Sequence, residues 1–252
     1  FKSTVGGGGT IPIKMSNWAY WLSDEQSNVS EIFNNGIPGD LTSLSPDVWW
    51  KLDADNVTIA SQVDVDDSSG NGVTGEGPFD RPAPSAHGFP KLVGTDVNAA
   101  GGTLATDYSF EFDGAWDYFD LGSPAALNLT GEMTASLWIN TSVVDGTLRF
   151  IVGQCNFAAS NFQWFIDINR SPHNGKLTIG TLNATILTST TALVVDTWYH
   201  VAFTRSGSAG NWDYVIYLNG IPDGTTTGST VDPGTQERTC IGRFGDLVGY
   251  YF

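Results

Sequence analysis

A series of short segments in which apolar and polar residues alternate is the feature that most constrains this fold. In the segment 134–140, one side of an extended chain would carry Ala135, Leu137 and Ile139, and the other Thr134, Ser136, Trp138 and Asn140. Similar runs occupy residues 149–154, 162–168, 176–181, 198–205, 212–219 and 239–243, separated by turn signals such as Asn174-Gly175. Many short strands without intervening helices predict an all-β protein, a two-sheet antiparallel β-sandwich.

Composition supports this fold class and disfavours several kinds of partner. The 252 residues include 30 glycines and 12% aromatic residues but only 15% charged residues, which favours strands and turns over helices. The formal net charge of −16 opposes binding to nucleic acid or to an anionic membrane, because like charges repel. No run approaches the ~20 apolar residues of a membrane-spanning helix. We therefore expect no nucleic-acid partner and no membrane span.

The first 44 residues differ from the alternating runs. A glycine-rich arm comes first, and residues 11–21 predict a strand with Pro12 at its start or at a sheet edge. Ser23-Asp-Glu-Gln26 matches a capping box and predicts the one short helix, which would end at Gly36. We place a boundary at position 45. Residues 1–44 then supply the arm, strand and helix, and residues 45–252 supply the sandwich.

The chain has two cysteines, Cys155 and Cys240, which are either free thiols or a single disulfide. Their number and spacing provide neither a zinc site nor a C-x-x-C redox motif. Two buried thiols are the preferred interpretation, and a single disulfide is the alternative.

Several segments together resemble one known family. Residues 108–114 read Tyr-Ser-Phe-Glu-Phe-Asp-Gly and are followed by Asp117-Tyr118, and the other segments are 67–72, 133–138, 197–203, 212–220 and 240–242. They resemble the laminin-G-like, concanavalin A-like jelly-roll domains over about residues 48–252. The resemblance implies that the sandwich is a concanavalin A-like jelly roll.

The closing strand of that family has its counterpart here at the wrong end of the chain. Lys14-Met-Ser-Asn-Trp18 and the helix after it resemble the closing element, which normally follows the penultimate strand. Three arrangements follow, because an unfilled strand position promotes aggregation. The strand closes its own permuted sandwich, enters a neighbouring subunit, or ends a preceding repeat of a tandem array. The apolar residues of this assembly strand are Ile11, Ile13, Met15, Trp18 and Trp21.

Two kinds of binding residue are candidates. Calcium prefers clustered carboxylate and carbonyl oxygens from loops, and related jelly rolls often carry one such ion. The candidate ligands are Asp67, Asn71, Asp113 and Asp117. The alternative interpretation is that these residues only form turns. Sugar binding needs exposed aromatic rings, and the candidates in or near loops are Trp116, Trp212 and Tyr250.

The sequence gives little support for catalysis. Glu111 and Asp113 alternate on one strand face, as the paired carboxylates of jelly-roll glucanases do, but Gly114 interrupts the strand and the third acid, Asp117, is displaced. The histidines are isolated from nucleophile and metal motifs. We expect the chain not to be an enzyme.

The leading functional hypothesis is a non-enzymatic structural module. The resemblance suggests a phage fibre, a capsid decoration or an extracellular surface filament, located on a virion exterior or a cell surface. Its partners would be copies of itself or other subunits of the assembly. The alternative is a calcium-dependent lectin or adhesin that binds cell-surface glycans, and a third is a glycan hydrolase or lyase of the same architecture.

Overall fold

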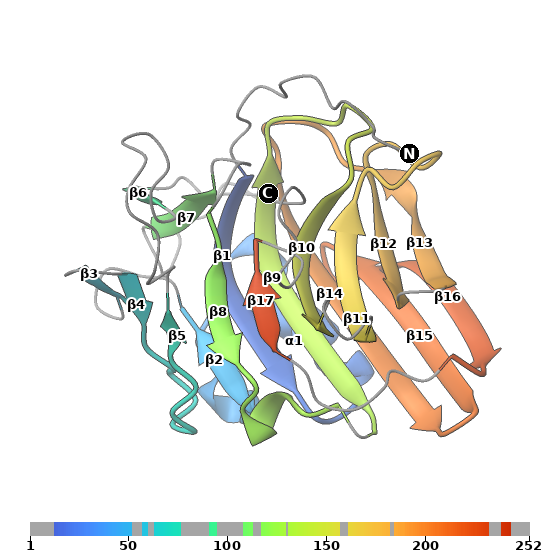
Figure 1. Ribbon diagram of the computed structural model, residues 1–252, viewed down its shortest axis with the longest axis horizontal. Helices are drawn as coiled ribbons and strands as arrows, with labels where there is room; N and C mark the ends of the chain where they lie inside the picture. The colour runs from blue at the N-terminus through green and yellow to red at the C-terminus, as the bar shows by residue number, and fades with distance from the viewer. Residues whose placement is uncertain are drawn as a thin grey trace.

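Two antiparallel sheets stacked face to face make up the body of the molecule (Figure 1). The computed structural model describes residues 13–51, 57–59, 63–76, 91–94, 108–112, 117–129, 131–156, 161–181, 184–231 and 238–242. Over these residues strands predominate, and the only α-helix is α1 (Val29–Phe33). The two-sheet sandwich with one short helix, predicted from the alternating runs, is confirmed.

Sheet A contains eight strands. Its hydrogen-bonded order is β16-β15-β14-β9-β1-β7-β6, and β2 also pairs with β1. The strands of sheet A are β1 (Ile13–Trp21), β2 (Val48–Trp50), β6 (Lys91–Gly94), β7 (Tyr108–Phe112), β9 (Met133–Thr141), β14 (Trp198–Ser208), β15 (Asn211–Leu218) and β16 (Ile221–Ser229).

Sheet B contains nine strands in the order β13-β12-β11-β10-β17-β8-β5-β4-β3. Its strands are β3 (Val57–Ile59), β4 (Val63–Val65), β5 (Gly75–Glu76), β8 (Phe119–Gly122), β10 (Arg149–Asn156), β11 (Asn161–Ile168), β12 (Lys176–Thr181), β13 (Ala184–Ala192) and β17 (Thr239–Ile241). The strands expected from the alternating runs agree with these bounds to within a few residues.

The N-terminal strand β1 occupies a central position in sheet A of its own chain. It pairs along its length with β9, and its two halves pair on the other side with β7 and with β2. A bulge between Ser16 and Ala19 separates the two halves, with Asn17 at a φ of 48°. The Asn17 Oδ1 accepts a hydrogen bond of 2.6 Å from the Trp49 indole, which anchors the bulge to β2. Of the three arrangements considered for this strand, the single chain contains the one in which it closes its own sandwich.

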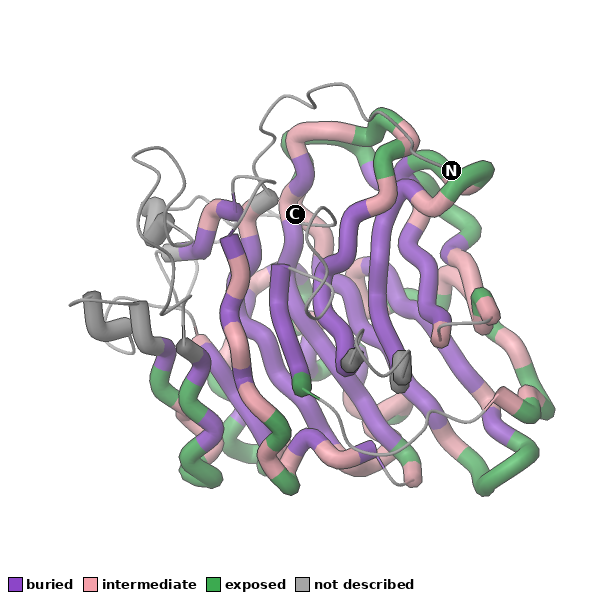
Figure 2. Tube along the Cα trace, viewed as in Figure 1, coloured by how far each residue is buried: buried purple, intermediate pink, exposed green. Residues whose placement is uncertain are grey.

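A chain of aromatic rings crosses the core and depends on β1. Trp18 contacts Trp50 of β2 with ring centroids 5.3 Å apart, and Tyr20 stacks on Trp164 of sheet B at 6.1 Å. Trp164 continues the series to Phe203 at 6.1 Å. All these residues are buried, and Figure 2 shows buried residues running through the middle of both sheets. Residues on both sides of position 45 therefore contribute to one hydrophobic core.

The helix is much shorter than the capping box predicted. The 3-10 turn η1 (Gln26–Asn28) precedes α1, and η2 (Asn34–Gly36) follows it. The Ser23 hydroxyl donates to the Glu25 carboxylate at 2.6 Å, and the Glu25 backbone N–H donates to the Thr134 hydroxyl at 2.9 Å. The Gln26 N–H, which a capping box directs to the Ser23 hydroxyl, instead donates to Asp24 Oδ1 at 3.1 Å, so the box does not form. The remaining 3-10 turns are η3 (Thr42–Leu44) and η5 (Ala125–Leu127).

The helical segment covers the outer face of sheet A. Phe33 stacks on Trp138 of β9 with centroids 5.9 Å apart, and Val29 packs against Ala202 and Tyr217. The face of β9 that alternation marked as polar is therefore buried as well, because a second layer covers it. In the described part of the chain, no helix is long and apolar enough to cross a membrane.

Replacing Trp18 by alanine should lower the free energy of unfolding by about 3–5 kcal/mol, because a fully buried indole is lost from the centre of sheet A. Urea unfolding followed by circular dichroism measures the change. Val194→Ala, at a position 59% exposed, is the control and should change stability by no more than about 0.5 kcal/mol. A Trp18→Ala variant as stable as the parent chain would contradict the central placement of β1.

Candidate functional site

The predicted calcium ligand Asp67 is fully engaged with its own loop. Its Oδ1 accepts from the backbone N–H groups of Trp49 (3.0 Å) and Ser69 (2.9 Å). Its Oδ2 accepts from the Ser69 hydroxyl (2.8 Å) and from the Val73 N–H (3.1 Å). Four hydrogen bonds from Trp49, Ser69 and Val73 explain this aspartate as a loop anchor, the alternative that the sequence left open.

The other predicted metal ligands do not complete a site with Asp67. The Asn71 side-chain amide donates to the Asp47 carbonyl at 2.9 Å, and Asp117 is buried before β8 with 3% exposure. Asp113 lies outside the described residues. Within the parts of the chain that the structure describes, no three His, Cys, Asp or Glu side chains are grouped so that they could hold a metal ion.

Replacing Asp67 by alanine should lower the free energy of unfolding by about 2–4 kcal/mol, because three buried or half-buried backbone donors lose their acceptor. The loss should be the same in calcium and in a chelator if Asp67 is a loop anchor. Thermal unfolding under both conditions measures this. A loss that appears only in calcium would instead identify Asp67 as a ligand.

Trp212, predicted as a sugar-stacking platform, is a core residue. Its ring is 3% exposed, and the Arg205 guanidinium lies 3.7 Å from the ring centroid. The prediction is wrong for this residue. Trp212 is the first of three alternating residues of β15, with Tyr214 and Ile216, that face the core. Its position near a turn did not reveal which face of the strand it occupies. Trp116 and Tyr250 lie outside the described residues.

Most of the predicted assembly-strand residues lie in the described part of the chain, and one does not. Met15, Trp18 and Trp21 are buried in β1, and Ile13 begins that strand. Ile11 lies outside the described residues. Of the two cysteines, Cys240 is fully buried in β17, and the side chain of Cys155 lies outside the described part.

Glu111, the best acid for catalysis in the sequence, lies opposite Lys14 in the register of sheet A. The register of β7 places it opposite Lys14 of β1 on one side and Lys91 of β6 on the other. Opposite charges at facing positions stabilise a sheet, so the arrangement explains Glu111 as a structural residue.

His200 is a buried structural histidine. It lies between Phe33 and Trp138, and its Nε2 is 2.8 Å from the Ser136 hydroxyl. Burial lowers the pKa of His200 to about 3, from an ordinary value of 6.5. The ring is therefore neutral at physiological pH and takes no part in general acid chemistry there.

His200 should make the chain less stable in acid. Below pH 6.5 the unfolded chain takes up a proton that the native chain does not bind until about pH 3, so stability falls across that window by up to ~1.4 kcal/mol per pH unit. His200→Gln should reduce the slope, as measured by urea unfolding at pH 6.5 and pH 5. His173→Gln, at a partly exposed position, should leave it unchanged. Equal slopes in both variants would argue against the buried neutral ring.

An arrangement that the sequence did not single out lies on the outer face of sheet B. Trp164 points into the core, so the alternating residues Phe165 and Asp167 lie on the opposite face of β11. Phe165 is flanked in register by Gly153 of β10 and Gly180 of β12. A Cβ atom at Gly180 would lie 2.7 Å from the Phe165 ring, so this glycine makes room for the ring.

The next row of the same face carries buried polar groups. Asp167 lies opposite Thr178, and Asn169 follows the end of β11. All three are fully buried. Three of their polar atoms, Asp167 Oδ1, Asn169 Nδ2 and Thr178 Oγ1, have no hydrogen-bond partner among the described residues. We refer to Phe165, Asp167, Asn169, Arg170 and Thr178 as the sheet B cluster.

Arg170 lies over the cluster. Its Nε donates to Asp167 Oδ2 at 2.9 Å, its Nη2 donates to the same oxygen, and its guanidinium is 4.8 Å from the centroid of the Phe165 ring. The Arg170 side chain is 28% exposed. Burial raises the pKa of Asp167 to about 7, although the nearby guanidinium opposes this shift. Asp167 therefore changes its charge near neutral pH.

A signal for this cluster was present in the sequence. Phe165 and Asp167 share one side of the predicted strand 162–168, and Arg170 follows within reach of both. An aspartate inside an otherwise apolar strand requires a partner when that strand is buried. The pattern nevertheless could not show that both faces of β11 are buried, and it therefore drew no attention to Asp167.

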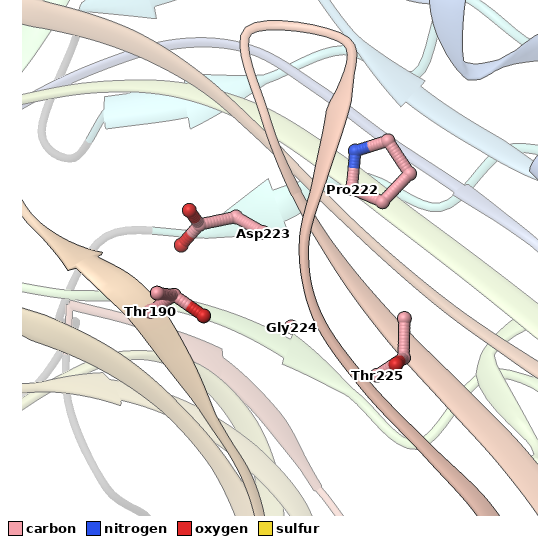
Figure 3. Close-up of a pocket in the computed structure, with 5 residues that line it drawn as sticks. All are labelled: Thr190, Pro222, Asp223, Gly224 and Thr225. Atoms are coloured by element: carbon pink, nitrogen blue, oxygen red, sulfur yellow. The ribbon is translucent and has the colours of Figure 1, made fainter.

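A surface hollow of about 480 Å³ lies where the edge strands of the two sheets meet. It is lined by Thr190 of β13 and by Pro222, Asp223, Gly224 and Thr225 of β16 (Figure 3). The Asp223 carboxylate accepts hydrogen bonds from the Thr191 backbone N–H (3.0 Å) and hydroxyl (2.6 Å). Asp223 thus joins the two edges, and none of the five lining residues is aromatic. The hollow is better explained as the seam of the sandwich than as a binding site.

Comparison with solved structures finds distant likenesses. A heptameric SAP-like pentraxin from Limulus polyphemus is 19% identical with a TM-score of 0.37, over 51% of this chain and 57% of the pentraxin chain. Domain 4 of AbnA, a GH43 extracellular arabinanase from Geobacillus stearothermophilus solved in complex with arabinotriose, is 13% identical with a TM-score of 0.47, over 94% and 88% of the two chains. This chain thus spans little more than half of the pentraxin's length. Comparison with curated protein sequences gives no match.

A family model covers more than half of the chain. The model Laminin_G_3, described as the concanavalin A-like lectin/glucanases superfamily, matches residues 113–251. This range contains every strand from β8 to β17, including the sheet B cluster. The chain belongs to the concanavalin A-like lectin/glucanases superfamily.

Proposed function

We propose that this protein is a non-enzymatic carbohydrate-binding module whose binding site is the sheet B cluster. The observation that carries the proposal is the combination of an aromatic ring with three buried polar atoms that lack partners among the described residues. Membership of a superfamily that includes lectins is consistent with it.

The unpartnered atoms favour a polar ligand. A buried polar group without a hydrogen bond costs about 1–3 kcal/mol, so such groups on Asp167 and Thr178, and on Asn169 just beyond the end of β11, are unfavourable unless another molecule satisfies them. Asp167 Oδ1 accepts, Asn169 Nδ2 donates, and Thr178 Oγ1 does either. Neighbouring hydroxyl groups of a saccharide both donate and accept, and therefore match this set.

The aromatic ring favours a saccharide over a smaller polar molecule. Binding sites combine an apolar surface with a few polar groups that set orientation. Phe165 would supply the apolar surface once Arg170 moves aside, because its ring is 3% exposed in the unliganded chain and packs edge-on against Phe150 with centroids 5.2 Å apart. Arg170 occupies the space over the ring and is the described side chain that a ligand would displace.

The cluster supports binding without turnover. Hydrolysis of a glycosidic bond uses two carboxyl groups about 5–10 Å apart. Among the described residues, the cluster contains one, Asp167, and its nearest charged neighbour in the hydrogen-bond network is a cation. We propose binding as the function for this reason, and propose no metal requirement for this site.

The assembly role stays a prediction. A virion or surface-filament location, calcium binding and strand exchange between copies have no independent support from the residues described. Within the single chain, β1 pairs with β9, β7 and β2.

Replacing Thr178 by valine should weaken glycan binding about tenfold while making the chain slightly more stable. The substitution removes one ligand hydrogen bond, and it also removes a buried hydroxyl that lacks a partner in the unliganded protein. A glycan array with neutral and acidic saccharides identifies the tightest oligosaccharide, and isothermal titration calorimetry then measures its affinity. Urea unfolding measures the stability.

Thr227→Val, at an exposed position of β16, is the matched control and should change neither quantity. If Thr178→Val binds the oligosaccharide as tightly as the parent chain, the cluster is not the binding site. If the array shows no glycan binding at all, ordered water satisfies the buried groups and the proposed function is wrong.

A further inference from the structure

Positive charge is scarce in this chain, and one of its cations, Arg170, lies over the sheet B cluster. The whole sequence has 11 Lys and Arg residues against 27 Asp and Glu residues. Arg170 lies over the cluster, and Lys176 is paired with the end of β11, where its carbonyl accepts from the Asn169 N–H at 3.3 Å. On a chain of net charge −16, a guanidinium at a binding face is a selective feature.

We propose that the sheet B cluster selects acidic saccharides, and that Arg170 binds the carboxylate or sulfate group of the ligand. This inference rests on the proposed function, because it names the ligand class of the same site. A guanidinium presents its N–H donors in a planar fork that suits a carboxylate or a sulfate. In the unliganded chain, Asp167 takes the place of that anion by accepting from Nε and Nη2.

Asp167 therefore competes with the ligand for Arg170. When Asp167 is ionised, its carboxylate holds the guanidinium against the Phe165 ring and repels an incoming anion. When Asp167 is protonated, Arg170 loses its ionic partner and is available to the ligand. Since burial raises the pKa of Asp167 to about 7, this exchange falls near neutral pH.

The other charged groups around Asp167 do not remove this dependence. The facing strand β12 contributes Lys176, and the β11–β12 connection contributes Arg170 and His173. From β10, Arg149 is bonded through its own guanidinium to Asp145 at 2.7 Å and 3.0 Å. The strand β13, beyond β12, carries no charged residue. Asp167 is thus the one carboxylate at this face among the described residues.

The Asp145–Arg149 pair provides an internal comparison. The Arg149 guanidinium holds the pKa of Asp145 below its ordinary range, so this pair stays intact through the neutral range. Asp145 is 39% exposed, whereas Asp167 is fully buried. Two Asp–Arg pairs at neighbouring strand ends therefore differ in burial, and only the buried pair opens as the pH falls through about 7.

The fraction of protonated Asp167 rises about tenfold between pH 8 and pH 6 for a pKa near 7. The affinity for an acidic saccharide should rise by about the same factor, and that for a neutral saccharide should not. The probes are hexagalacturonate and its methyl ester, which share one sugar backbone and differ in whether the carboxyl groups are charged, together with the acidic and neutral glycans of the array. Calorimetry at pH 8 and pH 6 measures both affinities.

Two substitutions test the roles of the paired residues. Asp167→Asn should bind the acidic probe equally at both pH values, because the competing charge is gone. Arg170→Met should lose most of the affinity for the acidic probe and retain binding of neutral glycans. Asp145→Asn is the matched control and should keep the tenfold dependence on pH.

The outcomes separate this inference from the proposed function. Binding of neutral glycans, lost in Thr178→Val, with no preference for acidic ones would overturn the inference and leave the function intact. A pH dependence that persists in Asp167→Asn would also overturn the inference. Absence of binding to every glycan on the array would overturn both.

Discussion

The insertion of β1 between β9 and β7 is the constraint on which the rest of the sandwich depends. Its Trp18 and Tyr20 connect the aromatic residues around Trp50 with those around Trp164, so the strand joins two halves of one core. The bulge at Asn17 lets the same strand pair with β7 along one half and β2 along the other. Because the chain continues from β1 into α1, placing the strand also brings the helical segment onto the outer face of sheet A.

Covering that face explains why so many polar groups are buried without being functional. Thr134, Ser136 and His200 lie under the segment from Ser23 to Phe33, and each is hydrogen-bonded there. The outer face of sheet B differs. Its buried Asp167 and Thr178 retain atoms that no described residue satisfies, and the described side chain above them is a partly exposed arginine. Unpartnered buried atoms also occur under the helical segment, at Trp138 Nε1 and His200 Nδ1, so the sheet B face is distinguished by the combination of such atoms with a partly exposed arginine above them.

Local patterns predicted the strands better than they predicted the roles of individual residues. The run 176–181 matches β12 at both ends, since turn signals on each side leave little choice of boundary. The capping box failed because the Ser23 hydroxyl donates to the Glu25 carboxylate, and the Gln26 N–H that the box needs donates to Asp24 Oδ1. Trp212 failed as a platform because position near a turn does not reveal which face a strand residue occupies. Asp67 fits the turn interpretation, which depended on neighbours only in its own loop and on β2.

The sequence by itself determined the fold class, the positions of most strands, the acidic character of the chain and the unusual placement of the closing strand. These properties depend on alternation, turn residues and composition, which are local or additive. Only the tertiary structure decided that β1 lies at the centre of sheet A, that α1 makes a second layer, and that Phe165, Asp167 and Thr178 meet under Arg170. Such contacts depend on strand register and on which face of a sheet is covered. Both are set by pairing between segments far apart in the chain.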